Sequence, residues 1–447
     1  MGMAFADALI DHADVHVTLV DRRHAPGGHW NDAYPFVQLH QASLFYGVAS
    51  TRLGDGAVQT GGPEAGLQQR ARRAEILAYY DDILHRRFVG TGRVTFLSGC
   101  DYEWDGSTHV VTSRVSRETT TVDVRRRVVD ATYLAPTIPA TTPAPFGVAG
   151  GARVLPIHQL ADLGDAPSRY VIVGSGKTAT DAIVWLLGNG VDPTRITWVR
   201  PRDPWMLNRS MVQPDPVVAV GLAADTLEAA SGATSLDDLF ERLEAMQVML
   251  RIDERVLPTM AKTPTLASWE LELLRTIEGV VRLGHVRRVE PGRLVLDQGE
   301  VPLEADAVVV HCAAAGLPQP PIVPIWASDR IRLQTTRAGF PCFCAALAGY
   351  VEATRDDDGE RNRICPPNGF PDTPAEWARM QVLGAAATAA FGAEPDIAEW
   401  ANGCDLNPAR IDPSRAEDPA LHRAQRRLRE HAAAGLARLA TLAHERG

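Results

Sequence analysis

The residues best suited to chemistry stand in one short run, GSGKTA, at residues 174–179. This run matches the pattern G-x-G-x-x-A, which turns a chain tightly at its first glycine and lets a phosphate approach the backbone at its second. The small last residue allows the following helix to pack closely. The sequence therefore predicts a dinucleotide-binding loop made of Gly174, Ser175, Gly176, Lys177, Thr178 and Ala179.

The segments around this loop predict the elements that must position it. Residues 170–173 form a short apolar run typical of a strand, residues 180–187 an Ala/Leu/Ile-rich helix, and residues 196–199 a second strand. In such a βαβ unit, the free N–H groups and the positive dipole end of the helix face the phosphates. The glycine pattern alone is a weak signal, but with both strands at βαβ spacing it is strong.

Two arginines follow the second strand of this unit, Arg200 and Arg202. An NAD site places an acidic residue at the end of this strand, where it binds the ribose hydroxyls. Arginine instead pairs with the 2′-phosphate of NADPH, so we expect NADPH as the cofactor. The alternative is that both are ordinary surface arginines.

The letters GSGKT also suggest the P-loop of a nucleoside triphosphatase. A P-loop needs a glycine five positions before Gly176, which wraps the loop around the β-phosphate. That position is Val171, inside the expected strand. A nucleoside triphosphatase therefore fits the sequence poorly.

The start of the chain has the order of the second half of another dinucleotide-binding unit. Residues 3–10 have helical apolar spacing, residues 15–20 alternate as a strand does, and Asp21 closes the strand. An acid at this place accepts hydrogen bonds from a ribose hydroxyl, and Gly2 fits the glycine that lets helix and strand approach. The first two glycines of this fingerprint would fall before Met1, so we expect a truncated motif. Alternatively, Met1 starts a peripheral helix and Asp21 is a solvated strand end.

Soon after Asp21 come a glycine pair and a tryptophan, at Gly27, Gly28 and Trp30. In this place the run resembles the flavin-containing monooxygenases and Baeyer–Villiger monooxygenases, as do the residues that follow: Tyr34, Pro35, Ser43 and Tyr46. The resemblance implies an FAD site, in which the glycine pair lets the backbone pass close to the flavin. The FAD-binding residues it implies are Gly2, Asp21, Arg22, Gly27, Gly28, His29 and Trp30, with Ala131 and Thr132 from a later segment.

The resemblance also implies the fold class, α/β with two Rossmann-like dinucleotide-binding domains whose parallel sheets carry helices on both faces. The NADPH domain is then inserted in the FAD domain. Residues 1–150 would form the first part of the FAD domain, 151–305 the NADPH domain, and 306–447 the return to the FAD domain with a helical C-terminal region. Residues 128–139 and 306–317 fit the two crossings, because their small residues let the backbone pass close to a dinucleotide, although generic buried strands would look similar.

Two dinucleotide sites imply hydride transfer from NADPH to FAD. The six cysteines include no C-x-x-C pair, which argues against a disulfide reductase of the same fold. In the resembled group, the reduced flavin captures oxygen and inserts one oxygen atom into a small organic substrate. We therefore expect an NADPH-dependent flavin monooxygenase. The alternatives are an FAD-dependent NADPH reductase or dehydrogenase that does not use oxygen, and a truncated, non-catalytic NADP-binding protein.

The resembled group carries a Phe-x-Gly-x-x-x-His motif shortly before the second fingerprint, and here His158 stands in a matching place. Ala152 and Val154 occupy the Phe and Gly positions, so only the histidine matches. His158 is the candidate catalytic residue, with a core or capping role as the alternative. The departure bears on the oxygen chemistry and leaves NADPH and FAD binding untouched.

Composition limits the remaining classes. The 447 residues carry a formal net charge of −10, from 45 basic and 55 acidic residues, which argues against a nucleic-acid-binding surface. No apolar run is long enough to span a membrane, and we expect no metal site. So few cysteines in a chain of this length suit a reducing cytoplasm. The sequence determines neither the substrate nor the oligomeric state.

Overall fold

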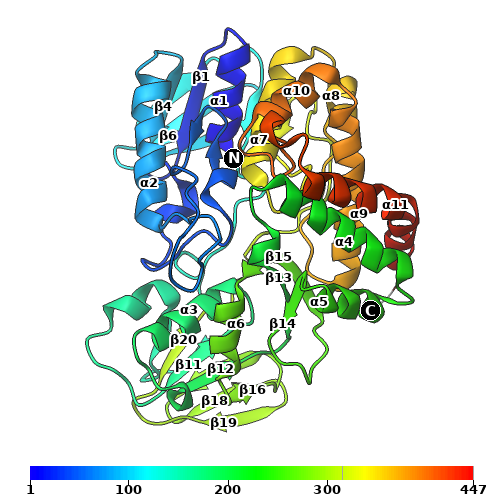
Figure 1. The fold of residues 1–447 in the computed structure, drawn as a ribbon. Coiled ribbons are helices and arrows are strands. Elements are labelled where there is room, and N and C mark those ends of the chain that lie inside the picture. Colours follow the sequence, from blue (N-terminus) through cyan, green and yellow to red (C-terminus); the bar gives the residue numbers. More distant parts are fainter. Residues whose placement is uncertain (315, 446–447) are drawn as a thin grey trace.

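The computed structural model describes residues 1–314 and 316–445. Helices alternate with strands, and parallel strand pairs occur in both halves of the molecule, so the α/β class is confirmed. The N-terminal part, blue in Figure 1, lies above the sheet that carries strands β11 and β12, and helices α4, α9 and α11 line one side. The expected crossing at residues 306–317 contains Ala315, which lies outside the described residues.

The largest sheet has five strands, all parallel, in the order β10-β20-β11-β12-β16. Every residue of β20, β11 and β12 is buried, because both faces of the sheet are covered, and these strands therefore read as continuous apolar runs. The strand bounds are β10 Val154–Pro156, β11 Tyr170–Val173, β12 Ile196–Val199, β16 Val280–Val281 and β20 Val308–His311.

Two layers cover this sheet. Since side chains alternate along a strand, Ile172 packs with helices α3 (Lys177–Gly188) and α6 (Ser268–Arg275) on one face, and Val173 packs on the other face. That second face meets an antiparallel sheet of three strands, to which a short fourth strand adds in parallel. These strands are β9 Gly147–Val148, β17 Val286–Glu290, β18 Arg293–Leu296 and β19 Gly299–Pro302.

The N-terminal lobe confirms the predicted helix-then-strand order of the first residues, with α1 at Gly2–His12 and β1 at Val17–Asp21. Strand β1 pairs in parallel with β4 (Val94–Ser98), and β8 (Val128–Asp130) pairs in parallel with β21 (Arg330–Arg332). Within the described part of the chain, β1 pairs only with β4, and β8 only with β21. The N-terminal strands therefore form two separate parallel pairs rather than one continuous sheet.

The pairing of β8 with β21 returns the chain to the N-terminal lobe after the five-stranded sheet. This order is what an inserted domain requires, whereas the domain boundaries themselves stay a prediction. After β21, helix α7 (Pro341–Thr354) packs along α1. At their crossing, a Cβ atom on Gly349 would overlap the carbonyl oxygen of Phe5, so glycine permits this close approach.

Smaller sheets complete the strand set. In the inserted part, β13 (Pro204–Asn208) lies between β14 (Met249–Arg251) and β15 (Met260–Leu266). An antiparallel ribbon in the N-terminal lobe and a short hairpin supply the rest: β2 Gly47–Val48, β3 Thr51–Arg52, β5 Cys100–Trp104, β6 His109–Ser113 and β7 Thr119–Val122.

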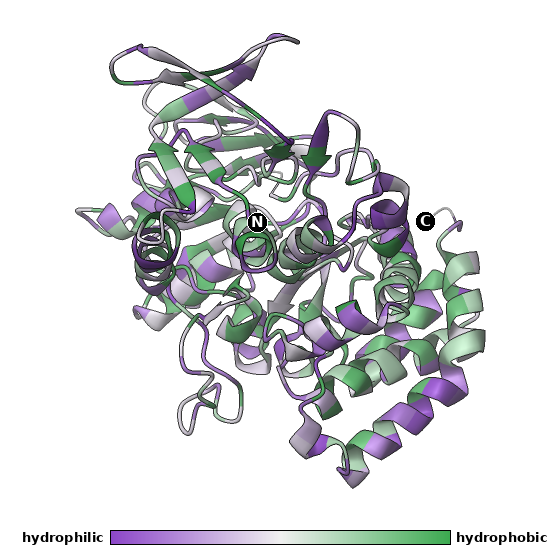
Figure 2. Ribbon diagram, turned by 90° about the horizontal axis from the view of Figure 1, so that it is seen from above, coloured by the Kyte–Doolittle hydropathy of each residue, from purple (hydrophilic) through white to green (hydrophobic). Residues whose placement is uncertain are grey.

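The remaining helices surround the sheets. Helices α4 and α11 lie against each other, and a Cβ atom on Gly435 would come within 2.5 Å of the Leu227 carbonyl oxygen. Hydrophilic residues gather along the outer helices at the rim of the molecule (Figure 2). Across residues 1–314 and 316–445, no helix is both long and apolar enough to cross a membrane. The bounds are α2 Arg73–Asp82, α4 Pro216–Gly232, α5 Leu236–Ala245, α8 Asp358–Ile364, α9 Pro374–Gly392, α10 Pro395–Gly403 and α11 Pro419–Leu442.

Candidate functional site

The five-stranded sheet gathers the predicted nicotinamide-site residues at one edge. Its strands are parallel, so their carboxyl ends share an edge, which is where α/β sheets bind ligands. Three predicted residues lie at this edge, and two that the sequence analysis missed join them. In strand order they are His158 after β10, His311 at the end of β20, Gly174 after β11, Arg200 after β12 and Arg282 after β16.

The glycine loop between β11 and α3 has the predicted geometry. Gly174 has a φ of 135°, and a Cβ atom there would lie 3.1 Å from the Cys312 carbonyl oxygen, so only glycine fits without strain. The Trp198 indole N–H holds this turn by donating to the Gly174 carbonyl over 2.8 Å. Around Gly176, by contrast, a Cβ atom would have no described atom within 4 Å. The loop therefore leaves open space beside its second glycine.

The first turn of α3 and Ser175 complete this loop. The helix begins after Gly176, and no described side chain caps its N–H groups. Thr178 lies in this first turn, and Ala179 is fully buried against the sheet. Ser175 is 8% exposed, and its hydroxyl has no hydrogen-bond partner among the described residues. A buried hydroxyl without a partner costs about 1–3 kcal/mol, which a bound phosphate would remove.

The side chain of Lys177 does not serve the loop as a P-loop lysine would. Its Nζ lies 2.6 Å from Asp181 in the same helix and 3.2 Å from Glu270, and the second ion pair joins α3 to α6. A P-loop lysine instead reaches the β- and γ-phosphates. That Lys177 binds the cofactor stays a prediction, and its backbone N–H, which has no acceptor within the helix, is the group left for this contact.

Arg200 is buried, which excludes the alternative that it is an ordinary surface arginine. Its side chain is 1% exposed, stacks on the Trp198 ring at 4.5 Å, and forms an ion pair of 3.0 Å with Asp203. Burial lowers the pKa of Arg200 to about 10. Its Nε and Nη1 have no hydrogen-bond partner in the described part of the chain.

Arg202 is bound to residues outside the five-stranded sheet. Its Nη1 lies 2.6 Å from Asp372, in the loop before α9, and its Nη2 donates to the Thr259 carbonyl over 2.8 Å. The sequence alone did not indicate these contacts of Arg202, because Thr259 and Asp372 are far from it in the chain.

The two histidines at the edge differ in burial. His158 is the second residue of the 3-10 helix Ile157–Asp162. It is half-buried, and its Nδ1 has no hydrogen-bond partner among the described residues. His311 is buried, its Nδ1 accepts the Ala313 N–H over 3.3 Å, and its Nε2 lacks a partner among the described residues. Burial lowers the pKa of His311, so it is neutral at pH 7. Its place at a strand end was the signal that could have found it.

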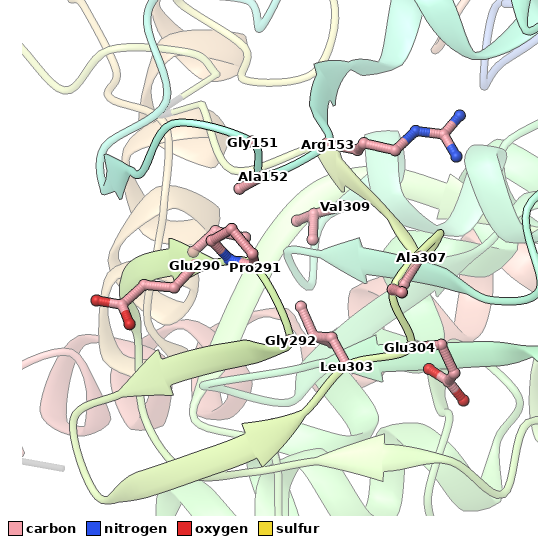
Figure 3. A pocket seen from close by; sticks show the side chains of 12 residues that line it. Gly151, Ala152, Arg153, Glu290, Pro291, Gly292, Leu303, Glu304, Ala307 and Val309 are labelled. Carbon is pink, nitrogen blue, oxygen red and sulfur yellow. The ribbon is translucent and has the colours of Figure 1, made fainter.

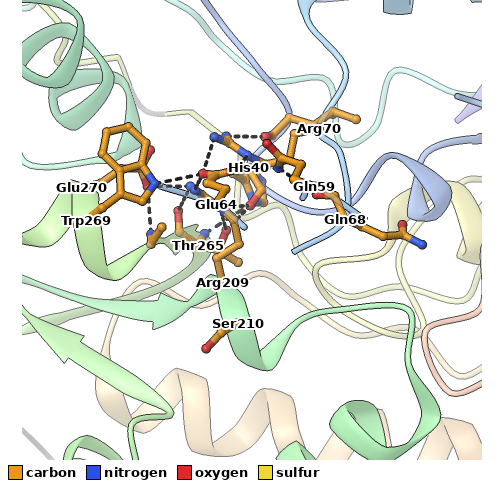
Figure 4. A network of polar contacts seen from close by, with 12 residues as sticks. His40, Gln59, Glu64, Gln68, Arg70, Arg209, Ser210, Thr265, Trp269 and Glu270 are labelled. Carbon is orange, nitrogen blue, oxygen red and sulfur yellow. Dashed lines mark hydrogen bonds and ion pairs between the residues drawn. The ribbon is translucent and has the colours of Figure 1, made fainter. Parts of the chain in front are cut away.

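A network of buried ion pairs lies beside this edge (Figure 4). Arg209 is 1% exposed and binds Glu64 at 2.5 Å and Glu270 at 2.6 Å, while Arg70 also binds Glu64, at 2.7 Å. Burial alone would raise the pKa of Glu270, but Lys177 and Arg209 outweigh it and lower the pKa to about 2. No sequence motif predicts this network, because its members come from distant parts of the sequence.

Two residues of the N-terminal lobe join the same region. The Tyr34 hydroxyl donates to Asp181 over 2.6 Å, and the His40 carbonyl accepts from Arg209 Nε over 3.0 Å. Burial, together with the charges of Lys177 and Arg209, lowers the pKa of His40 to about 3. The loop that carries the resemblance to the monooxygenases is therefore bonded to the helix of the second fingerprint.

The residues predicted for FAD lie around the start of α1. A Cβ atom on Gly2 would stand 3.1 Å from the Cβ of Ala131, at the end of β8, so the two predicted residues meet. Asp21 ends β1, and its carboxylate accepts the Arg23 N–H over 2.9 Å. Thr132 is exposed and donates to Asp130 over 2.7 Å, which tightens the turn after β8.

Both residues of the glycine pair have the positive φ values that glycine favours. Gly27 and Gly28 have φ values of 108° and 56°, and a Cβ atom on Gly27 would lie 2.8 Å from Leu77. Trp30 is buried, and its indole N–H donates to the Tyr46 hydroxyl over 2.6 Å. Hence the turn lies against α2, and Tyr46 fixes the tryptophan.

His29 and Arg22 have different surroundings. Burial lowers the pKa of His29 to about 4, and the positive charges of the N-terminal amino group and Arg23 add to this effect. The side chain of Arg22 is 68% exposed and lies 3.4 Å from Asp101. His29 is therefore part of the interior beside the glycine pair, whereas Arg22 lies on the surface.

Two cavities lie away from the glycine loop. The one in Figure 3, between β10, β20 and the β17–β18 turn, has a volume of about 10 Å³, enough for about one water molecule. A larger one of about 290 Å³ lies between Leu44, the loop before α4 and residues 405–415. Both of its arginines are already in ion pairs, Arg410 with Asp405 and Arg415 with Asp215, which lies just outside the lining. Neither cavity includes the glycine loop.

Comparison with solved structures returned proteins of low identity. They include Tmm from Pelagibacter sp. strain HTCC7211 (12% identity, TM-score 0.48, 96% of this chain and 87% of that one). Cyclohexanone monooxygenase from Rhodococcus sp. Phi1 bound to NADP+ has 13% identity, a TM-score of 0.46, and coverage of 97% and 95%. Flavin-containing monooxygenase from Stenotrophomonas maltophilia has 15% identity and a TM-score of 0.42, and the match covers 78% of this chain and 93% of that one.

Comparison of sequences gave a stronger match. No family model matches the chain. The uncharacterized proteins Rv2000 of Mycobacterium tuberculosis and Mb2023 of Mycobacterium bovis are each 40% identical to it over 410 residues, which are 91% of this chain and 75% of theirs. The chain therefore belongs to the same family as these uncharacterized mycobacterial proteins.

Proposed function

We propose that the protein is an NADPH-dependent flavoprotein oxidoreductase. The observation that carries this proposal is the loop from Gly174 to Gly176, at the carboxyl end of a buried parallel strand. An uncapped helix start, open space beside Gly176 and the buried, unpartnered Ser175 hydroxyl occur there together in the described structure. These features fit the pyrophosphate of a dinucleotide.

The residues of the N-terminal lobe fit FAD. The close approach of Gly2 to Ala131 leaves the start of α1 beside the end of β8, and Asp21 ends the neighbouring strand, where a ribose hydroxyl would bind. Gly27 and Gly28 let the backbone pass close to a flat ring. Bound together, the two cofactors supply hydride-transfer chemistry.

The chain's own residues would orient the two cofactors. Tyr34 and Asp181 join the lobe that would hold FAD to the helix that would hold the NADPH pyrophosphate. The Arg209 network ties the N-terminal lobe to α6 through direct ion pairs with Glu64 and Glu270. Fixed geometry of this kind is what transfer between two bound molecules requires.

We infer further that the reduced protein oxygenates a small organic substrate. The resemblance of Gly27, Gly28 and Trp30 to the monooxygenase pattern supports this, and His158 is the candidate catalytic residue at the shared strand edge. One observation favours a second candidate, an NADPH reductase that does not use oxygen. Ala152 and Val154 replace the Phe and Gly of the monooxygenase motif that contains His158.

The test compares two glycine variants of the full chain. Gly176→Ala has room in the fold but puts a methyl group where a phosphate would approach, and Gly188→Ala has the same room at the end of α3. We expect Gly176→Ala to weaken NADPH binding about tenfold or more, the effect of one lost hydrogen bond to a charged group. Gly188→Ala should bind NADPH as the wild type does.

Equal NADPH affinity in Gly176→Ala and wild type would refute the dinucleotide site. Flavin retained by the purified protein, read from its absorbance, tests the FAD site separately. Oxygen uptake coupled to NADPH oxidation distinguishes the two candidates: uptake supports the monooxygenase, and NADPH oxidation of a yellow protein without uptake supports the reductase.

A further inference from the structure

Arg282 and Arg200 are neighbours at the carboxyl edge of the five-stranded sheet. Strand β16 pairs with β12 so that Val281 stands opposite Val199, and the Arg200 N–H donates to the Val281 carbonyl over 2.9 Å. The next residue on each strand is therefore an arginine. In a βαβ nucleotide site, the end of the second strand meets the adenosine ribose, so an anionic group on that ribose would lie beside both.

Arg200 is not placed to contact such an anion. Only 1% of its side chain is exposed, and it is enclosed by the Trp198 ring and Asp203. Trp198 in turn holds the Gly174 carbonyl. Arg200 therefore supports the loop through Trp198, and a phosphate could reach it only if this packing opened.

Arg282 is the arginine at this edge that combines exposure with a fixed position. Its side chain is 31% exposed, and its Nε and Nη2 lie 2.8 and 3.1 Å from the two oxygens of Asp203. Nη2 also donates to Asp253 over 2.8 Å. Nη1 makes no hydrogen bond to any described residue. The two carboxylates thus fix the Arg282 guanidinium at the edge of the sheet and leave its Nη1 available to a ligand.

The charges around Arg282 also favour an anion. Among the described residues, Arg200, Arg255 and Arg282 pair with two carboxylates, Asp203 and Asp253, and both carboxylates are already bound by arginines. The cluster therefore has one positive charge in excess. Arg202 adds nothing here, because it pairs with Asp372.

We propose that Arg282 contacts the 2′-phosphate of NADPH, and that Arg200 is a positioning residue which acts through Trp198 and the Gly174 turn. This assignment rests on the proposed function. The carboxylates of Asp203 and Asp253 orient Arg282, and a 2′-phosphate accepts from its remaining N–H groups. A ribose that carries only hydroxyls gains little from this contact, so Arg282 selects NADPH over NADH.

The experiment measures the affinities of the full chain for NADPH, NADH and 2′,5′-ADP by titration calorimetry. Arg282→Ala should weaken binding of NADPH and 2′,5′-ADP by about ten- to a hundredfold, as expected for a lost charge-assisted contact, and should change NADH affinity less than about threefold. Arg282→Lys keeps the charge and should recover part of the NADPH affinity. Arg287→Ala, an exposed arginine on β17 outside the cluster, is the matched control and should change neither.

Arg200→Ala provides the contrast. Because Arg200 acts on the loop, its loss should weaken NADPH and NADH by similar factors. Equal weakening of both cofactors in Arg282→Ala would overturn the assignment, and so would selective loss of NADPH in Arg200→Ala with none in Arg282→Ala. If the wild type bound neither cofactor, the proposed function itself would fail. Thermal melting of Arg282→Ala and Arg282→Lys shows whether each variant is folded, and a folded Arg282→Lys keeps the test valid if Arg282→Ala does not fold.

Discussion

The Tyr34 hydroxyl donates a 2.6 Å hydrogen bond to the carboxylate of Asp181, which also binds Lys177 at 2.6 Å. Tyr34 belongs to the N-terminal loop that resembles the flavin monooxygenases, and Asp181 lies in the helix of the second fingerprint. This bond thus connects the two candidate cofactor sites directly. Loss of this bond should lower the stability of the protein and weaken the contact between the N-terminal loop and α3.

Tyr34→Phe should lower the free energy of unfolding by about 1 kcal/mol, the net value of a typical hydrogen bond. The ring can stay in place, because its packing against Phe36 at 4.8 Å does not need the hydroxyl. Urea denaturation measures the change. Tyr133→Phe removes a more exposed hydroxyl, which donates to Pro321, and should cost less. A larger loss in Tyr133→Phe than in Tyr34→Phe would contradict this ranking.

Arg209→Met should be far more damaging, by about 3–5 kcal/mol, because it leaves Glu64 and Glu270 buried without their shared cation. The surface pair of Arg52 and Asp405 offers the control, since Arg52 is 54% exposed. Arg52→Met should change stability by no more than about 1 kcal/mol. Denaturant melts of both variants test the difference, and similar losses would show that the network is not a stabilising element.

Acid should destabilise the protein well above the range in which carboxylates titrate. The folded-state pKa values of His29 and His40 are lowered to about 4 and about 3 from 6.5. A lowered histidine pKa gives stability that is present above pH 6.5 and is lost as pH falls toward the folded pKa, because only the unfolded chain takes up the proton.

His40→Gln should therefore make the fall in stability between pH 6 and pH 4 shallower by up to about 1.4 kcal/mol per pH unit, the value of one proton. Denaturation curves at several pH values give the slope. The exposed His24 serves as control, and His24→Gln should keep the wild-type slope. An unchanged slope in His40→Gln would mean that this side chain is not buried as a neutral group.

Gly349→Ala should destabilise the crossing of α1 and α7 by about 1–3 kcal/mol, the usual range for an overfilled contact, because the new methyl group would overlap the Phe5 carbonyl. Gly221→Ala, in the middle of α4 with no described atom within 4 Å of its Cβ position, should instead stabilise by about 0.5–1 kcal/mol. The thermal unfolding temperatures of the two variants test both the predicted loss and the predicted gain of stability. The interpretation fails if Gly349→Ala melts at or above the wild-type temperature.

The sequence alone predicted the elements of the second fingerprint, because their causes are local. The apolar run at residues 170–173, the glycines at 174 and 176 and the small Ala179 specify a strand, a turn and a closely packed helix through short-range sterics. The same holds for the helix and strand of residues 2–21. These features were confirmed in the structure.

Only the tertiary structure decided how the charged residues are used. Arg200 follows its strand as predicted, but its burial depends on Trp198 and Asp203, and Arg282 reaches the same edge only because β16 pairs with β12. Arg209, Glu64 and Glu270 meet because three distant segments pack together. An ion pair depends on distance in space, which the order of residues does not encode, whereas turns and helices depend on neighbours in the chain.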